Sequence, residues 1–373
     1  MTLKNEFVDY VKNEVGIPLV GVVAPEDYPS EDYERIAAVQ RIFAKATPLS
    51  GGIDTVFQPK DFLPEAKSVI ITGSPAYIEK VYTYEQCKRD LLGCAEATHV
   101  NTNYLQNNGE RNAKIIDFLK DRGYQCFSLT AGGFPLKLMA SKCGVGFYGK
   151  NAIIQHPKYG AWISLSGYIT DADLEPDSPL DMDCGKCDLC MKACPTNALS
   201  TPYVCDMTKC IDFHLGHNKH FIPYEIRENC GNLLGEGCTI CRDVCPKNKN
   251  LTPLEDFEVS MELMHPKMLD VLKISDEDWE RGFAMTLMGF FLMDKKYLIR
   301  NAAIGLGNFQ DERAVEPLGE ILNAGPNKAR GYAAWALGRI RGRKSRDLLN
   351  SALNNEEDED IRDEIKFALE MLG

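Results

Sequence analysis

The sequence of 373 residues is 44% hydrophobic and 26% charged, which is typical of a globular protein with enough apolar side chains for more than one core. Its formal net charge of −12 argues against non-specific nucleic-acid binding, which needs clustered Lys and Arg side chains. The N-terminus MTLKNEFVDYVKNE is no secretory signal and no apolar run reaches the roughly 18 residues of a membrane span, so we expect a cytoplasmic protein.

Residues 1–175 alternate helix-like and strand-like segments. The stretch DYERIAAVQRIFAKA has the apolar spacing of an amphipathic helix, and SVIITGSPAYI is typical of a buried strand. GAWISLSGYITD is a further strand that leads towards a cysteine-rich region. We therefore predict the α+β fold class, with an N-terminal α/β domain over residues 1–175.

Residues 176–255 are rich in Cys, Pro, Gly and Asn and show little apolar periodicity. Ten of the fourteen cysteines lie between Cys184 and Cys245. Because cytoplasmic thiols stay reduced, this clustering favours metal or redox chemistry over disulfides. We expect a metal centre to organise this domain in place of a hydrophobic core.

Residues 256–373 are predicted to be helical and repetitive. YLIRNAAIGLGNFQDERAVEPLGEIL and KARGYAAWALGRIRGRKSRDLLNSAL share one design, with Gly307 and Gly338 31 residues apart, and DIRDEIKFALEML begins a truncated third copy. Such HEAT-like repeats serve as a binding surface or a structural cap. Residues 330–346 carry six basic side chains and no acid, which indicates either a nucleic-acid patch or a solvated helix end followed by a turn.

The first cysteine motif has the spacing C-x2-C-x2-C-x3-C-P, formed by Cys184, Cys187, Cys190, Cys194 and Pro195. In two-cluster ferredoxins three such thiolates hold one cluster and the fourth ligates the other. A second motif, GCTICRDVCPKN, supplies Cys238, Cys241 and Cys245 but lacks the usual first cysteine. Four zinc-bound thiolates are the alternative, but zinc ribbons do not require two C-x3-C-P endings.

We predict two [4Fe-4S] clusters from this spacing. The crossed arrangement assigns cluster 1 to Cys184, Cys187, Cys190 and Cys245. Cluster 2 then has Cys194, Cys238, Cys241 and one distant cysteine, for which the candidates are Cys205, Cys210 and Cys230.

The order of these motifs resembles that of the epoxyqueuosine reductases, a cobalamin-dependent iron–sulfur family related to reductive dehalogenases. The resemblance covers residues 125–373 and includes GVGFYGKN (144–151), the first cysteine motif, KCIDF (209–213), FIP (221–223), the second cysteine motif and the helical repeats. It implies that Cys210 of KCIDF is the fourth ligand of cluster 2.

The resemblance also implies a corrinoid between the N-terminal domain and the cluster module, with electrons passing from the clusters to its cobalt. The corrinoid contacts implied for this sequence are Gly146, Ile154, Leu165, Tyr168, Asp212 and Thr239. Glycines of the GVGFYGKN motif would let the backbone approach a flat macrocycle closely.

Two departures from the family concern the chemistry. Thr130 stands where the family has an acid, and no carboxylate occurs between Asp121 and Asp171. The N-terminal Y-A-x-G-x-D-Y-H motif of the family has no counterpart either. Because reduction of an epoxide needs a proton donor, we name Tyr148 and Lys150, together with Thr130, as the catalytic candidates. Of three histidines after Cys210, at positions 214, 217 and 220, we expect one near the site and two on the surface.

Three functions are compatible with these motifs. The first is a cobalamin-dependent iron–sulfur reductase with an unestablished substrate. The second is an epoxyqueuosine tRNA reductase whose catalytic acid has been replaced. The third is an electron-transfer or corrinoid-activating protein. We expect an external low-potential electron donor of the ferredoxin or flavodoxin type, and a tRNA or protein partner on the HEAT-like repeats.

Overall fold

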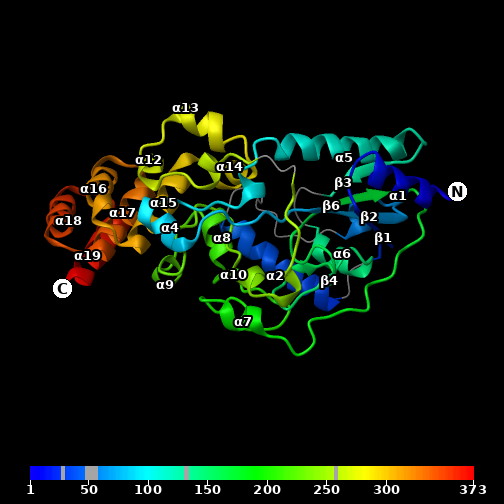
Figure 1. Ribbon diagram of the computed structural model, residues 1–373, viewed down its shortest axis with the longest axis horizontal. Coiled ribbons are helices and arrows are strands. Elements are labelled where there is room, and N and C mark those ends of the chain that lie inside the picture. The colour runs from blue at the N-terminus through cyan, green and yellow to red at the C-terminus, as the bar shows by residue number, and fades with distance from the viewer. Residues whose placement is uncertain (27–29, 47–57, 130–133, 256–258) are drawn as a thin grey trace. The chain divides into compact units, whose positions relative to one another are not determined.

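The computed structural model describes residues 1–26, 30–46, 58–129, 134–255 and 259–373 (Figure 1). They form two compact units: unit 1 comprises residues 1–79, 106–208 and 239–257, and unit 2 comprises residues 80–105, 209–238 and 258–373. The chain passes repeatedly from one unit to the other, which differs from the three consecutive domains predicted from the sequence. No helix within the described ranges is both long and apolar enough to cross a membrane.

Unit 1 is built on a four-stranded antiparallel sheet of order β1-β2-β6-β3. Its strands are β1 (Leu19–Val23), β2 (Ser68–Pro75), β3 (Cys126–Ser128) and β6 (Ile163–Thr170). The helices of this unit are α1 (Leu3–Asn13), α2 (Ser30–Ala46), α3 (Pro59–Phe62), α5 (Tyr104–Lys120), α6 (Leu136–Lys142), α7 (Leu189–Ala193), α10 (Ile240–Asp243) and the 3-10 turn Pro246–Asn248. Together with the helical unit 2, this antiparallel sheet confirms the α+β class.

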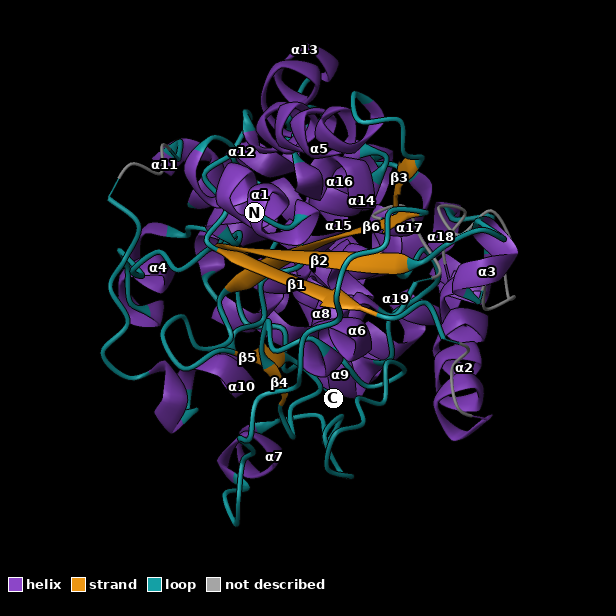
Figure 2. Cartoon of the chain, turned by 90° about the vertical axis from the view of Figure 1, so that its right-hand side faces the viewer, coloured by secondary structure: helices purple, strands orange, loops and turns teal. Residues whose placement is uncertain are grey.

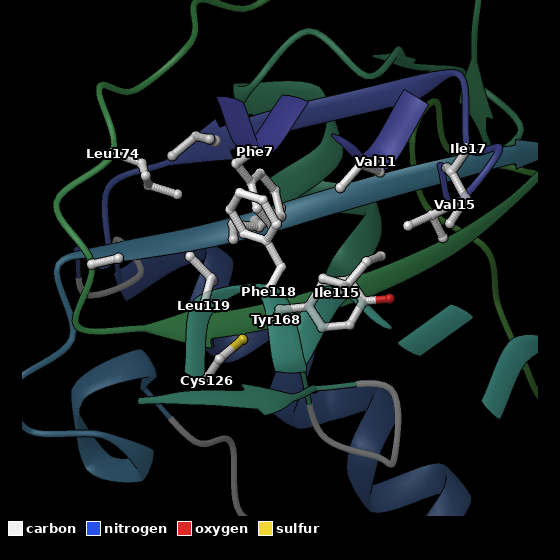
Figure 3. Close-up of a cluster of buried hydrophobic side chains, with 13 residues drawn as sticks. Phe7, Val11, Val15, Ile17, Ile115, Phe118, Leu119, Cys126, Tyr168 and Leu174 are labelled. Carbon is white, nitrogen blue, oxygen red and sulfur yellow. The ribbon is translucent and has the colours of Figure 1, made fainter. Parts of the chain in front are cut away.

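Helices cover both faces of this sheet, α1 and α5 on one face and α6 on the other (Figure 2). Successive strand residues point to opposite faces, so Val69 and Ile71 of β2 pack towards α6 while Ile70 packs towards α1 and α5. Figure 3 shows the core on the α1 side, where Phe7 and Phe118 meet edge to face with ring centroids 5.5 Å apart.

The GVGFYGKN segment forms a small hairpin of β4 (Phe147–Tyr148) and β5 (Ile154–Gln155), in which Tyr148 pairs with Ile154. Gly146 precedes β4, and a Cβ atom there would lie 2.3 Å from Ile154 Cγ2 and 2.8 Å from the Gln155 carbonyl oxygen. The packing of the hairpin itself therefore requires glycine at this position.

Unit 2 is helical. Its shorter elements are α4 (Tyr84–Asp90), α8 (Ile211–Gly216), α9 (Tyr224–Arg227), α11 (Met261–Met264), α12 (Met268–Leu272), α13 (Asp276–Asp278), α14 (Leu287–Leu292), the 3-10 turns Ala97–His99 and Glu312–Ala314, and the π-helical turn Trp279–Phe283. Its longer helices are α15 (Lys295–Phe309), α16 (Val315–Ala324), α17 (Asn327–Ile340), α18 (Arg343–Asn355) and α19 (Glu359–Leu372).

The predicted 31-residue repeat appears as close packing between alternate helices. A Cβ atom at Gly307 of α15 would lie 2.9 Å from Ala336 Cα of α17, and one at Gly338 of α17 would lie 3.0 Å from Ala368 Cα of α19. Equivalent glycines thus allow equivalent close approaches. The HEAT-like character predicted for this part of the chain is confirmed.

Candidate metal centre

Four cysteine side chains gather around one cavity in unit 1. The cavity is lined by Cys184, Cys187, Cys190 and Cys245, together with Lys150, Asn151, Gln155, Leu189 and Pro246. These are the cysteines that the crossed spacing assigns to cluster 1, three from one loop and the fourth from a segment far along the chain. The structure therefore brings together the complete predicted donor set.

Local backbone structure explains how the spacing places the thiols. The Cys187 N–H donates to the Cys184 carbonyl in a turn, and α7 follows directly, with Cys190 in its first turn. Cys245 lies just before Pro246, at the start of a 3-10 turn. Neither α7, α10 nor this turn has a buried residue, so apolar packing contributes little to their position.

The electrostatics of the cavity favour neutral thiols over thiolates. Burial raises the pKa of the Cys190 and Cys245 thiols, and the neighbouring thiols raise it further, because four thiolates in one place repel each other. Iron that binds there would supply the positive charge that deprotonation requires.

Zinc and a [4Fe-4S] cluster can both be bound by four thiolates. Zn–S bonds of about 2.3 Å bring four thiolate sulfurs to about 3.8 Å from one another. Among the described residues, no group of three or more His, Cys, Asp or Glu side chains is placed to hold a single metal ion. The preference for a [4Fe-4S] cluster over zinc therefore rests on the paired C-x3-C-P spacing.

Lys150 is tied to the loop of cluster 1. Its ammonium group donates to the main-chain carbonyls of Gly185 at 2.7 Å and Cys187 at 2.9 Å, and its backbone N–H lies 3.4 Å from Cys184 Sγ. These contacts tie Lys150 to the loop that carries Cys184 and Cys187, and its role as a proton donor stays a prediction.

The cysteines predicted for cluster 2 are divided between the units. Cys194, at the C-terminal end of α7, and Cys241, in α10, belong to unit 1, whereas Cys210 and Cys238 belong to unit 2. Their assembly into one cluster stays a prediction of the spacing and of the resemblance.

The two polar residues named as corrinoid contacts make hydrogen bonds close to these ligands. Asp212 Oδ1 accepts the main-chain N–H groups of Gly237 at 2.7 Å and Cys238 at 3.0 Å. The Thr239 hydroxyl donates to Asp243 Oδ2 at 2.7 Å, within the same short helix α10. Both side chains therefore help to shape the turn that carries Cys238 and Cys241.

The apolar residues named as corrinoid contacts do not share one face of the sheet. Leu165 packs with Ile154 and Tyr148 on the α6 side, whereas Tyr168 lies in the core on the α1 side (Figure 3). The Tyr168 ring is fully buried, its hydroxyl donates to Asn112 Oδ1, and burial raises its pKa to about 12. The assignment of Tyr168 to the corrinoid is thus corrected, because strand alternation turns it away from Leu165.

Of the catalytic candidates, Tyr148 is half-buried at the end of β4, with the Arg35 guanidinium 5.8 Å from its ring centroid. Thr130 lies outside the described residues.

Of the three histidines after Cys210, His214 is buried, His217 is partly buried and His220 is exposed, so the prediction of two surface histidines is wrong. His214 is 5% exposed and its Nδ1 lies 3.0 Å from Asn218 Nδ2, while only His220 of the three is exposed. His217 instead belongs to a polar cluster that the sequence did not reveal, in which its Nε2 contacts Glu236 Oε1.

This polar cluster is centred on the buried carboxylate of Glu236. His99 Nε2 lies 3.4 Å from Glu236 Oε2, opposite the contact with His217. Burial alone would lower the pKa of His99, but the carboxylates of Glu236, Glu96 and Asp212 outweigh it and raise the pKa. Burial alone would raise the pKa of Glu236, but His217, His99 and Lys219 keep it below its usual value.

The basic stretch 330–346 is largely paired with acids. Arg330 makes two 2.9 Å hydrogen bonds to the Glu356 carboxylate, Arg339 lies 3.1 Å from Glu228, and Lys344 contacts Glu316. These acids are distant in the sequence, so the apparent basic patch is offset in three dimensions.

Comparison with known proteins matches both the cysteine-rich and the helical regions. Residues 183–248 match the 4Fe-4S double cluster binding domain family, and residues 293–370 match the HEAT repeats family. The epoxyqueuosine reductase of Bacillus subtilis (strain 168) is 30% identical over 380 residues, which cover 99% of this chain and 96% of that protein. The enzyme of the same name from Staphylococcus aureus (strain NCTC 8325) is 32% identical over 369 residues, 97% of this chain and 95% of that one.

Solved structures extend the similarity to the whole fold. A structure of the Bacillus subtilis epoxyqueuosine reductase matches with a TM-score of 0.88 at 29% identity and covers 100% of this chain and 99% of its own. An epoxyqueuosine reductase in complex with an epoxyqueuosine-modified tRNA-Tyr stem loop also has a TM-score of 0.88, and covers 99% and 98% of the two chains.

Proposed function

The chain belongs to the epoxyqueuosine reductase family of oxidoreductases, and on that premise we propose that it is a corrinoid-dependent iron–sulfur reductase acting on epoxyqueuosine in tRNA. The observation that carries the proposal is the four-thiol cavity, which lies within a matched double-cluster region in a chain that is similar to its relatives from end to end.

Electrons would enter at cluster 1 from a low-potential donor of the ferredoxin or flavodoxin type. Cys190 and Cys194 lie at the two ends of the five-residue helix α7, so one short element would connect the ligands of both clusters. This is the crossed arrangement that lets ferredoxins pass an electron between neighbouring clusters.

We propose that residues on the α6 side of the sheet contact one edge of the corrinoid. Leu165 and Tyr148 are partly buried there and would contact the macrocycle, with Ile154 and Gly146 packed behind them. When bound, the corrinoid would supply a low-potential cobalt centre that delivers electrons to the substrate. The protein supplies the apolar contact surface.

Conversion of an epoxide into an alkene consumes two electrons and two protons and releases the oxygen as water. The two clusters account for the electrons, since each carries one at a time. For a proton we propose the phenol of Tyr148, because it is half-buried, packs like Leu165 against the same apolar cluster, and belongs to the GVGFYGKN hairpin.

An anaerobic assay tests this function. The reconstituted protein is supplied with cobalamin, a strong reductant and a tRNA stem loop that carries epoxyqueuosine, and queuosine is measured by mass spectrometry. We expect product from the wild type and at least a 100-fold slower rate for Tyr148→Phe, the scale of general-acid catalysis. Tyr10→Phe, a change at a tyrosine in the opposite core, should leave the rate unaltered.

A different electron acceptor is the second candidate, and the replacement of the family acid by Thr130 favours it. In this case the same clusters and corrinoid would reduce another small molecule or the corrinoid of another protein. Full cluster and cobalamin content with unchanged epoxyqueuosine would support this second function and contradict the first.

A further inference from the structure

Asp212 connects the two segments of unit 2 that carry predicted ligands of cluster 2. It is the second residue of α8, which begins directly after Cys210. Its Oδ1 atom accepts hydrogen bonds from the main-chain N–H groups of Gly237, at 2.7 Å, and of Cys238, at 3.0 Å. One carboxylate oxygen therefore holds the backbone at Cys238 from a position two residues after Cys210.

This arrangement has two electrostatic effects on a cluster bound by Cys210 and Cys238. A carboxylate close to the ligands repels an added electron, which stabilises the oxidised cluster. In addition, the N–H groups of Gly237 and Cys238 are directed to a carboxylate oxygen, whereas N–H groups that donate to cluster sulfur stabilise the reduced form. Both effects lower the reduction potential.

The neighbouring carboxylate of Glu236 is placed differently. It contacts His217 Nε2 through one oxygen and lies 3.4 Å from His99 Nε2 through the other, so ring nitrogens face both of its oxygens. The two hydrogen bonds that Asp212 Oδ1 accepts come from uncharged main-chain donors. Of these two carboxylates, Asp212 is the one bonded directly to the backbone of a ligand cysteine.

We propose that Asp212 is a positioning residue that sets the reduction potential of cluster 2 to a low value. The inference rests on the proposed two-cluster function and deepens it, because a low-potential inner cluster increases the driving force for electron transfer to the corrinoid. It also gives the side chain a role other than the corrinoid contact that the resemblance implies.

Redox titration of the anaerobically reconstituted full chain, followed by electron paramagnetic resonance, tests the proposal. Asp212→Asn keeps an oxygen that accepts the two N–H groups and removes the charge. We expect the reduction potential of one of the two clusters to rise by at least about 59 mV. For a one-electron couple this is a tenfold change of the equilibrium in favour of the reduced state. An unchanged potential, or a shift to lower potential, would overturn the proposal.

The matched control is Asp183→Asn at cluster 1. Asp183 Oδ1 accepts the Gly185 N–H at 2.6 Å beside Cys184, a similar contact, but the side chain is exposed, so water and salt screen its charge. Its effect should be less than threefold and confined to the other cluster. An equal effect of both variants would overturn the proposal, because the partly buried Asp212 would then act no differently from an exposed carboxylate.

Loss of cluster 2 in Asp212→Asn is addressed by Asp212→Ser, which also removes the charge and keeps an acceptor oxygen. If both variants lack the cluster while cluster 1 remains, Asp212 is needed for assembly and its proposed role in potential is wrong. If the wild type itself shows no cluster signal, the proposed function fails, and that result is distinct from the others.

Discussion

Different interactions stabilise the cysteine-rich loops of unit 1 and the helical repeats of unit 2. Helices α7 and α10 bury no residue, whereas α15 buries eleven and α17 buries nine. The repeats are stabilised by close packing of small and apolar side chains, and the loops converge on a cavity lined by four thiols. On the proposed function, metal ligands would take the place of a hydrophobic core where the chain has few apolar residues to bury.

Removal of one ligand should have the largest effect, and only on the loops. We expect Cys187→Ala to lose cluster 1 and the order of its loop, because four thiols line the cavity and the variant leaves three. Iron content should fall by half while the circular dichroism of the helices is retained. Cys230→Ala is the control, since that buried thiol donates to the Ile226 carbonyl within unit 2 and should leave the iron content unaltered.

Glu364→Ala should destabilise the helices and leave the iron content unaltered, the opposite of the result expected for Cys187→Ala. Glu364 accepts two hydrogen bonds from the Arg227 guanidinium, at 2.7 and 2.6 Å, and both side chains are buried. Leaving Arg227 unpaired should lower the free energy of unfolding by about 3–5 kcal/mol. Urea unfolding followed by circular dichroism measures this, and iron content should not change.

The control for this prediction is Glu316→Ala, which removes the partner of Lys344 on the surface. Because both side chains are largely exposed and solvent screens their charges, the free energy of unfolding should hardly change. Equal losses for the two variants would contradict the role assigned to the buried pair.

Lys150→Met tests whether the hydrogen bonds of Lys150 to the cysteine loop protect cluster 1. The variant loses two charge-assisted hydrogen bonds to the carbonyls of Gly185 and Cys187, each worth about 1.5–3 kcal/mol in favourable cases and less where solvent reaches the group. Cluster 1 should bleach several-fold faster in air, as measured by visible absorbance. Lys192→Met, which removes an exposed ion pair with Asp188 in the same loop region, should bleach like the wild type.

The smallest effect is a pH dependence within unit 2. Burial, aided by Arg300, lowers the pKa of Lys219 to about 7 from an ordinary value of 10.5. Between these values the unfolded chain binds more protons at this site, so the free energy of unfolding should rise with pH, by up to about 1.4 kcal/mol per unit. Below pH 7 this contribution to the slope disappears.

Urea unfolding at pH 7, 8 and 9 checks this slope against Lys219→Met, which should lack it. Lys296→Met is the control, because hydrogen bonding to Asp294 raises the pKa of Lys296 and moves its titration above this range. A wild type and a Lys219→Met variant with parallel pH profiles would show that Lys219 titrates normally.

Much of this organisation was predictable from local sequence patterns. The 31-residue spacing of Gly307 and Gly338 predicted the repeats. Each of these glycines lies where a neighbouring helix packs so closely that a larger side chain would clash. The C-x2-C-x2-C-x3-C-P spacing selected Cys184, Cys187 and Cys190, and the crossed arrangement selected Cys245, which all line one cavity.

Contacts between distant segments were not predictable in the same way. The bonds from Gly237 and Cys238 to Asp212, and the pairing of His217 with Glu236, depend on the course of the chain between them. The acids that offset the basic stretch 330–346 are likewise remote in sequence. The placement of Leu165 and Tyr168 on opposite faces of the sheet could have been predicted, because side chains alternate along a strand. The resemblance to the family, which named both as corrinoid contacts, did not take this alternation into account.

The most direct test of the central claim is the cofactor content of the chain after anaerobic reconstitution with iron, sulfide and cobalamin. Two [4Fe-4S] clusters and one corrinoid predict about eight irons, about eight acid-labile sulfides and about one cobalt per chain. Zinc bound in place of iron, or a full complement of iron with no cobalamin retained, would contradict a corrinoid-dependent iron–sulfur reductase.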